Sequence, residues 1–209
     1  GIQTCALPIS LVAGDPSISI TNPSSPTTTV TGVPAGESAT LRWTISNGTC
    51  ADSFDEIILT NHAPPSTANA GLDQENCNDG NFTLNANTPV SGTGTWTVIS
   101  GGPSVTVVDP SDPDSDVTGV PAGVTAVLRW TISNGTCADS FDEVELTNYA
   151  LPTIADAGDP EIEQCNNGTF LLNANTPAVG TGTWTLVAGD PGINITNPSS
   201  PTTTVTGVP

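Results

Sequence analysis

Three aspartates in one short stretch have the spacing of a calcium-binding loop. Asp112, Asp114 and Asp116 alternate with other residues in DPSDPDSD at 109–116. Calcium loops place carboxylate oxygens at positions i, i+2 and i+4, because alternate residues of a turn can face one ion. The equivalent stretches of the chain carry hydroxyl residues there instead, namely Ser25, Thr27 and Thr29, and Ser200, Thr202 and Thr204. The alternative to a calcium site is a solvated acidic loop.

A second acidic motif, CADSFDE, occurs twice. Its carboxylates are Asp139, Asp142 and Glu143 in one copy, and Asp52, Asp55 and Glu56 in the other. Further acidic residues follow two Pro-bearing connectors, namely Asp73 and Glu75, and Asp159, Glu161 and Glu163. Together these groups could bind calcium between neighbouring repeats. The alternative is an ion pair with Arg42 or Arg129, which contributes at most ~1 kcal/mol at an exposed position.

Catalytic chemistry has few residues to use. The chain has one histidine, His62, which lies beside Pro64 and Pro65 in a connector. A Ser–His–Asp triad or a Cys–His pair would need that histidine. The next connector has Tyr149 at the same position, so such a site would not recur. Carboxylates are numerous, but a glycosidase pair also needs a concave site. We therefore expect no catalytic residue and no cofactor other than calcium.

Four cysteines occupy two recurring positions of the sequence, Cys77 and Cys165 at one and Cys50 and Cys137 at the other. Two sets of disulfides fit this pattern. One joins Cys77 to Cys137, and the other joins Cys50 to Cys77 and Cys137 to Cys165. Both suit an oxidising, exported setting. We favour Cys77–Cys137, because a repeat must be stable at any position in an array. Free thiols are the remaining alternative.

The charge balance restricts the partners. The chain has 21 acidic residues and two basic ones, so its net charge is -19. Nucleic acids and anionic membranes bind through Lys and Arg, so we expect neither as a partner. The sequence contains no run of 18 apolar residues, so we expect no membrane insertion of this segment. Frequent Gly, Pro and Thr indicate an all-β chain with many turns.

An internal repeat organises the chain. LRWTISNGTCADSFDE begins at residue 41 and again at residue 128, a shift of 87. NTPVSGTGTWT at residue 87 returns as NTPAVGTGTWT at residue 175, a shift of 88. A repeat of 87–88 residues has the size of a whole domain. We predict one complete unit at 62–148, the C-terminal part of a unit at 10–61 and the N-terminal part of another at 149–209.

The first nine residues, GIQTCALPI, match no other part of the chain. The repeat would place a copy of TPAVGTGTW there, and agreement begins abruptly with SLVAGDP at 10–16. QTCALPI resembles the translation of a sequencing adapter. We interpret 1–9, including Cys5, as an artefact joined to a gene fragment, and the lack of Met agrees with a fragment. The alternative is a divergent N-terminal cap.

Alternating apolar residues predict strands that are buried on one side, and hence two packed sheets. Within 62–148 these residues are Phe82, Leu84 and Ala86; Trp96 and Val98; Val105 and Val107; Ala126, Leu128, Trp130 and Ile132; Val144 and Leu146. SNGTC between the last two strands predicts a hairpin turn, because Asn-Gly accepts positive φ. The triplet Asn-Gly-Thr begins at Asn47, Asn134 and Asn167 and is also an N-glycosylation acceptor.

The stretches PPSTANAGLDQENC, NFTLNA and LRWTISNGTC resemble the PKD-like, immunoglobulin-type repeats of large bacterial surface adhesins of the gliding-motility-associated kind. The resemblance covers 10–209 and implies tandem Ig-like β-sandwiches with an extracellular or cell-surface location. The chain departs from true PKD domains, because TWTVISGG replaces their Trp-Asp-Phe-Gly-Asp motif. Such modules mostly act as spacers, so the resemblance implies a structural role.

We therefore expect a non-catalytic stalk or adhesive segment of a secreted or cell-surface bacterial protein. Its expected partners are neighbouring repeats of the same chain, and surface glycans or proteins. The alternative from another class is an accessory or carbohydrate-binding module of a secreted hydrolase. A carbohydrate binder needs an exposed aromatic strip, whereas Trp96 and Trp130 are predicted to face inward.

Overall fold

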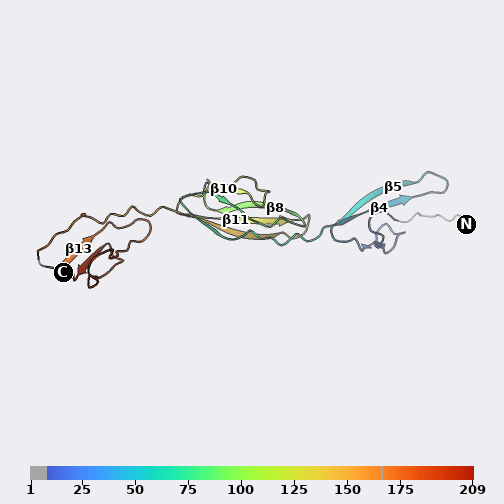
Figure 1. The fold of residues 1–209 in the computed structure, drawn as a ribbon. Helices are drawn as coiled ribbons and strands as arrows, with labels where there is room; N and C mark the ends of the chain where they lie inside the picture. Colours follow the sequence, from blue (N-terminus) through green and yellow to red (C-terminus); the bar gives the residue numbers. More distant parts are fainter. Residues whose placement is uncertain (1–8, 166) are drawn as a thin grey trace.

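The computed structural model describes residues 9–165 and 167–209, and every regular element among them is a β-strand. The strands fall into three groups that follow one another along the molecule (Figure 1). We call them the N-terminal segment (10–61), the central segment (62–148) and the C-terminal segment (149–209). Each sheet in the described residues draws its strands from one group, except that the last central strand ends at Tyr149. The predicted all-β, Ig-like fold class is confirmed.

The central segment is a sandwich of two sheets. Its strands are β6 (Gln74–Cys77), β7 (Phe82–Thr83), β8 (Thr93–Ser100), β9 (Thr106–Val107), β10 (Asp116–Thr118), β11 (Val124–Ser133) and β12 (Ser140–Tyr149). One sheet has the order β6-β12-β11-β8 and the other β7-β10-β9. All pairs are antiparallel except β6 with β12, which run parallel.

The core lies between these two sheets, as the alternating pattern predicted. Trp130, Leu128, Ile132 and Ala126 on β11 are fully buried, and they meet Phe82 and Val117 of the opposite sheet. The rings of Trp96 and Trp130 lie against each other with centroids 5.1 Å apart and planes tilted by 44°. Val98 was also predicted to be buried, yet it is 39% exposed. Val98 lies on the edge strand β8 next to a register shift in its pairing with β11, whereas Trp96 on the same strand is buried.

The connector before β6 belongs to the core, which its sequence did not indicate. Ala70 is buried, and its N–H donates to Asp142 Oδ2 at 2.9 Å. The N–H of Ala68 donates to Ser140 Oγ at 2.9 Å. The extended stretch 66–70 therefore lies along the start of β12 and continues into β6, which pairs with the end of β12.

The other two segments each contain part of the same sandwich. The N-terminal segment has β1 (Ser10–Ala13), β2 (Ser19–Ile20), β3 (Val30–Thr31), β4 (Glu37–Ile45) and β5 (Ser53–Asn61). Its sheet β1-β4-β5 repeats β8-β11-β12, since Ser10 pairs with Arg42 as Thr97 pairs with Arg129. The C-terminal segment has β13 (Thr169–Asn173), β14 (Asn194–Ile195) and β15 (Thr202–Thr206). Its order β13-β15-β14 repeats β7-β10-β9.

In the N-terminal segment, Ala39 and Leu41 are buried like their central counterparts, but side chains at other core positions are exposed. Ile132 is 0% exposed, whereas its N-terminal counterpart Ile45 is 61% exposed. Val144 is 1% exposed, whereas its counterpart Ile57 is 59% exposed. The repeated sequences therefore adopt the same strands even where the facing sheet is reduced to β2 and β3, the counterparts of β9 and β10.

Candidate functional site: the joint between consecutive segments

In the N-terminal and central segments, an asparagine near the end of the last strand is hydrogen-bonded to an earlier part of the same segment. Asn61 Nδ2 donates to the Val33 carbonyl at 2.8 Å, and the Asn61 carbonyl accepts from Gly36 N–H at 2.6 Å. Asn148 Nδ2 donates to the Val120 carbonyl at 2.8 Å, and its carbonyl accepts from Gly123 N–H at 2.6 Å. The two sites are equivalent positions of the repeat. The direction in which the chain leaves each segment is therefore fixed by the same bonds.

A hairpin turn of the central segment holds the connector that enters it. Asn134, at the tip of the β11–β12 hairpin, donates from Nδ2 to the Ala63 carbonyl at 2.8 Å and to Ser91 Oγ at 3.2 Å. Cys137 Sγ makes longer contacts with the carbonyls of His62 and Ala63, at 3.5 and 3.4 Å. The turn thus binds two consecutive carbonyl groups of the connector.

Gly135 in this turn lies against the only histidine. Its φ is +60°, a left-handed conformation that glycine adopts without strain. A Cβ atom at Gly135 would lie 2.2 Å from the His62 ring. The predicted Asn-Gly hairpin turn is confirmed, and its glycine is needed for the close approach of the connector as well as for the turn.

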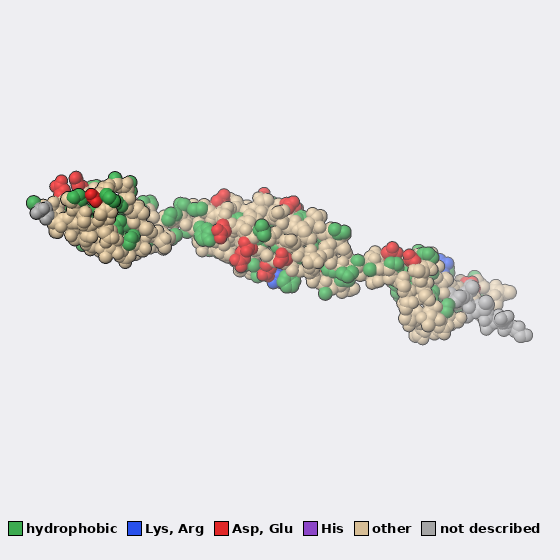
Figure 2. Space-filling view, turned by 60° about the horizontal axis from the view of Figure 1, so that its bottom comes forward, with side chains coloured by type: hydrophobic (Ala, Val, Ile, Leu, Met, Phe, Trp, Pro, Cys, Tyr) green, Lys and Arg blue, Asp and Glu red, His purple; other side chains and the backbone are tan. Residues whose placement is uncertain are grey.

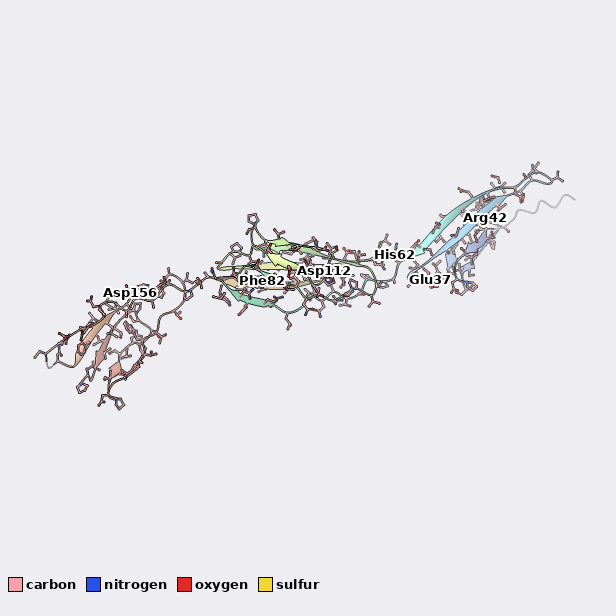
Figure 3. The ribbon with its side chains drawn as sticks, turned by 45° about the horizontal axis from the view of Figure 1, so that its top comes forward. Glu37, Arg42, His62, Phe82, Asp112 and Asp156 are labelled. Atoms are coloured by element: carbon pink, nitrogen blue, oxygen red, sulfur yellow. The ribbon has the colours of Figure 1, made fainter. Side chains whose placement is uncertain are left out.

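Only one residue lies between the hydrogen bonds that hold Asn61 and those that hold Ala63. Asn61 is bound to the N-terminal segment and Ala63 to the central segment, so His62 alone separates them (Figure 3). Ser66 follows closely: its N–H donates to the Ser91 carbonyl at 2.9 Å, and its Oγ accepts from Val90 and Ser91 N–H groups. A connector bonded on both sides of one residue has little freedom to bend.

The second joint repeats the first in part. Tyr149 takes the position of His62, and its carbonyl accepts from Asn78 N–H at 2.7 Å. Its hydroxyl donates to Glu75 Oε1 at 3.3 Å. The nearby Glu75 carboxylate raises the pKa of Tyr149, first through its charge and then through this hydrogen bond. Thr153 repeats Ser66, since its N–H donates to the Val179 carbonyl and its Oγ1 accepts from Val179 N–H.

The structure does not bring the first group of calcium candidates together. Asp112 Oδ1 accepts from the N–H of Asp114 at 3.0 Å, and Asp116 Oδ1 accepts from Thr83 Oγ1 at 2.8 Å. Asp109, just before them, accepts from Ser111, and these bonds lower the pKa of Asp109. Asp109 and Asp112 therefore accept hydrogen bonds within turns of their own loop, whereas Asp116 is bonded to β7.

The second group is also engaged elsewhere. Asp142 accepts from the Ala70 N–H, and Glu143 Oε1 pairs with Arg129 at 2.6 Å. Within 9–165 and 167–209, Asp139 and the other acidic residues form no group of three that could hold a metal ion. Figure 2 shows acidic side chains at several places along the molecule. The ion-pair alternative is the arrangement found, and it recurs between Arg42 and Glu56 at 2.6 Å.

The favoured disulfide does not fit the fold. Cys77 pairs in register with Tyr149 at the end of β12, whereas Cys137 lies in the turn before β12 begins. Ten residues of β12 separate the two ends, roughly 30 Å at 3.3 Å per residue. A disulfide requires Cα atoms within about 7 Å, so Cys77–Cys137 is wrong for a single repeat. Cys50, Cys77, Cys137 and Cys165 are all free.

The aromatic residues give no flat binding strip on the central segment. Trp96 and Trp130 are buried against each other. Phe141 is 59% exposed, but the Arg129 guanidinium lies over its ring at 4.3 Å from the centroid. Arg42 covers Phe54 in the same way at 4.2 Å.

The sequence analysis did not predict the joint between segments, although the recurrence of Asn before His62 and before Tyr149 was a usable signal.

Comparison with known proteins gives structural similarity alone. No family model matches the chain, and no curated protein matches it in sequence. A three-Ig fragment of titin with Glu-to-Ala mutations is 11% identical over 95% of this chain and 77% of its own, with a TM-score of 0.49. A segment of mouse cadherin-23 is 13% identical over 97% and 75%, with a TM-score of 0.42. At these scores the similarity carries no functional information.

A further match is the surface layer protein SbsC, domains 4–9, at 15% identity over 99% of this chain and 35% of that one, with a TM-score of 0.30. Among the described residues no helix is long and apolar enough to cross a membrane.

Proposed function

We propose that the chain is a non-catalytic spacer segment of a secreted or cell-surface protein. In this proposal the repeat units are 10–61, 62–148 and 149–209, the outer two being parts of units. They hold functional parts of a longer protein apart, and their partners along the chain are their own neighbours. The resemblance of the sequence to PKD-like adhesin repeats supports a bacterial surface setting.

The observation that carries the proposal is the joint at His62. A spacer keeps its ends apart only if consecutive domains do not fold back on each other. Flexible linkers of Gly and Ser allow such folding, whereas this connector is bonded at Asn61 and again at Ala63. The acidic surface also favours extension, because like charges on successive domains repel one another.

The test uses a matched pair of glycines. Gly135 and Gly48 have nearly the same φ, +60° and +57°, so alanine strains both turns equally. A Cβ at Gly135 meets the His62 ring, whereas a Cβ at Gly48 has nothing within 4 Å. In small-angle X-ray scattering at low concentration, we expect Gly135→Ala to shorten or broaden the distribution of interatomic distances. Gly48→Ala should match the parent chain.

A second pair of variants removes side-chain hydrogen bonds without adding a larger side chain. Asn134→Ala removes the donor to Ala63, and Asn47→Ala removes the equivalent, exposed asparagine of the N-terminal segment. Circular dichroism should show that all four variants keep their strands. If Gly135→Ala and Asn134→Ala scatter like their controls while folded, the joint does not set the shape and the spacer proposal loses its support.

A further inference from the structure

The side-chain amide of Asn134 is held at the first joint through its nitrogen. Nδ2 donates to the Ala63 carbonyl at 2.8 Å and to Ser91 Oγ at 3.2 Å, and the side chain is half-buried. The loop that carries Ser91 lies close against this turn, since a Cβ added at Gly92 would be 2.5 Å from the Ser133 carbonyl. The amide nitrogen is therefore bonded to two different parts of the central segment.

The residue that follows makes this amide chemically labile. In an Asn-Gly sequence the backbone nitrogen of the glycine attacks the side-chain carbonyl carbon, because glycine has no side chain to hinder the approach. A bond forms between Gly135 N and Asn134 Cγ, the bond from Cγ to Nδ2 breaks, and a cyclic imide remains. Nδ2 takes the proton of the Gly135 N–H through solvent and leaves as ammonia. Water then opens the imide to aspartate or isoaspartate, so the net reaction consumes water and releases ammonia.

The closed joint opposes this reaction at the leaving atom. Nδ2 is both the nitrogen that departs and the donor of the two hydrogen bonds, so its loss as ammonia breaks both. The backbone is also fixed, because the Cys137 N–H donates to the Asn134 carbonyl at 3.2 Å across the turn. Breaking hydrogen bonds between partly buried groups costs free energy. Deamidation therefore requires the joint to open first.

The acid product has no donor to face it at the joint. The Ala63 carbonyl only accepts hydrogen bonds. Ser91 Oγ has a single hydrogen, which it donates to the Pro64 carbonyl at 2.9 Å, so it too offers only lone pairs to position 134. A carboxylate between these two acceptors is an unpaired charge in a half-buried place, which is costly. The joint does not close again around the acid.

We propose that Asn134 is a deamidation site that the closed joint protects, and that its deamidation releases the joint irreversibly. A brief opening is reversed when the amide binds the Ala63 carbonyl again. An opening that lasts until ammonia is lost becomes permanent, because the acid cannot replace the donor. The site thus records the total time that the joint has spent open. This inference concerns the central segment and its entry connector, and it does not depend on the spacer role.

The chain contains its own reference for the reaction rate. Asn47 and Gly48 lie in the same sequence, LRWTISNGTCADSFDE, and their turn has the equivalent hydrogen bond, from Cys50 N–H to the Asn47 carbonyl at 3.1 Å. The φ angles of Gly48 and Gly135 are +57° and +60°. Asn47 is exposed, whereas Asn134 is half-buried. Because the neighbouring residues are identical, a difference in rate between the two amides measures their contacts in the folded chain.

The first experiment measures deamidation in the full 209-residue chain at mildly alkaline pH. Trypsin separates Asn47, in 43–129, from Asn134, in 130–209, and fragment masses locate the conversion of amide to acid. We expect Asn134 to react at least about tenfold more slowly than Asn47, since two hydrogen bonds must break first. In concentrated urea the two amides should react at equal rates.

A pair of serine variants tests whether the joint is the cause. Ser91→Ala removes one acceptor of Asn134 Nδ2 and leaves the Asn-Gly sequence intact. We expect it to speed the deamidation of Asn134 about fivefold, the effect of one hydrogen bond, and to leave Asn47 unchanged. Ser111→Ala removes a bond within its own loop and should match the parent chain. A variant that has unfolded is recognised because both amides then react as they do in urea.

A second experiment tests the release of the joint. Asn134→Asp reproduces the aspartate product. The Ser66 N–H donates to the Ser91 carbonyl, so hydrogen exchange at Ser66 reports whether the connector is bound. We expect Asn134→Asp to speed this exchange about tenfold, and Asn47→Asp to leave it unchanged.

Three results overturn the proposal. Asn47 and Asn134 react at equal rates in the folded chain; Ser91→Ala keeps the parent rate at Asn134; or Asn134→Asp leaves exchange at Ser66 unchanged. Scattering from a freely bending chain would remove the spacer role alone, since none of these three measurements depends on the overall shape.

Discussion

At the scale of single residues, Tyr149 reports on the second joint. It is the only tyrosine of the chain, so its ionisation can be followed by ultraviolet absorbance without overlap. Glu75 raises its pKa above the ordinary value of 10.0. We expect Glu75→Gln to lower that pKa toward 10.0, because the repelling charge is removed. Glu37→Gln, on the N-terminal segment, should leave the titration unchanged.

The sign of the pH effect follows from the direction of this shift. A folded-state pKa above the unfolded one means that the folded chain holds the phenol proton more tightly. The stabilising contribution is complete below the unfolded pKa and is lost as pH rises through the folded pKa. A Tyr149 pKa that is equal in the parent and Glu75→Gln would contradict the contact between the two side chains.

Residue spacing alone does not decide between a calcium loop and an acidic turn. The alternation of Asp112, Asp114 and Asp116 serves a calcium loop, but it serves equally a loop in which an aspartate accepts from the N–H two residues on. The structure has the second arrangement at Asp109 and at Asp112. Sequence cannot separate the two cases, because both need a carboxylate followed by a turn.

At the scale of strands, the same substitution at two equivalent positions measures how much the facing sheet contributes to stability. Ile132 and Ile45 occupy the same position of equivalent strands, at 0% and 61% exposure. We expect Ile132→Ala to lower the free energy of unfolding of the central segment by about 2–5 kcal/mol, since it leaves a cavity in a closed core. Ile45→Ala should change stability by less than about 0.5 kcal/mol.

The measurement is thermal unfolding in dilute solution. Equal effects of Ile132→Ala and Ile45→Ala would mean that the N-terminal segment has a closed core, contrary to the exposed sheet face described above.

Strands with period-two alternation were predictable, and the others were not. β11 and β12 follow the alternating pattern, because each has one face in the core and one in solvent. β6 has the sequence QENC, with no apolar alternation, and it forms because its backbone pairs with β12. The disulfide prediction failed for the same reason, since it needed the course of the chain between Cys77 and Cys137. The burial of Ala68 and Ala70 was not predicted either, because alanine is small enough to occur at buried or exposed positions.

At the scale of the whole molecule, the charge of -19 governs the response to ions. The described residues hold no cluster of carboxylates fit for a metal ion, so divalent cations should act by screening alone. We expect millimolar calcium and magnesium to raise the melting temperature by equal amounts, and a matched ionic strength of NaCl to do nearly the same. Differential scanning calorimetry makes the comparison.

A rise with calcium that magnesium does not match would indicate a specific site, through linkage of binding to folding. Asp139→Asn and Asp112→Asn would then locate it in one or the other acidic group.

The parallel pairing of β6 with β12 has a mechanical consequence. The chain enters the central segment through 66–77 and leaves it at Tyr149, and these two stretches run side by side in the same direction. Tension between the two ends therefore slides one stretch along the other. The hydrogen bonds between them lie across that direction, so they bear the load together and do not open one after another. Resistance to pulling is set by the rate at which this whole seam ruptures, and not by the equilibrium stability of the sandwich.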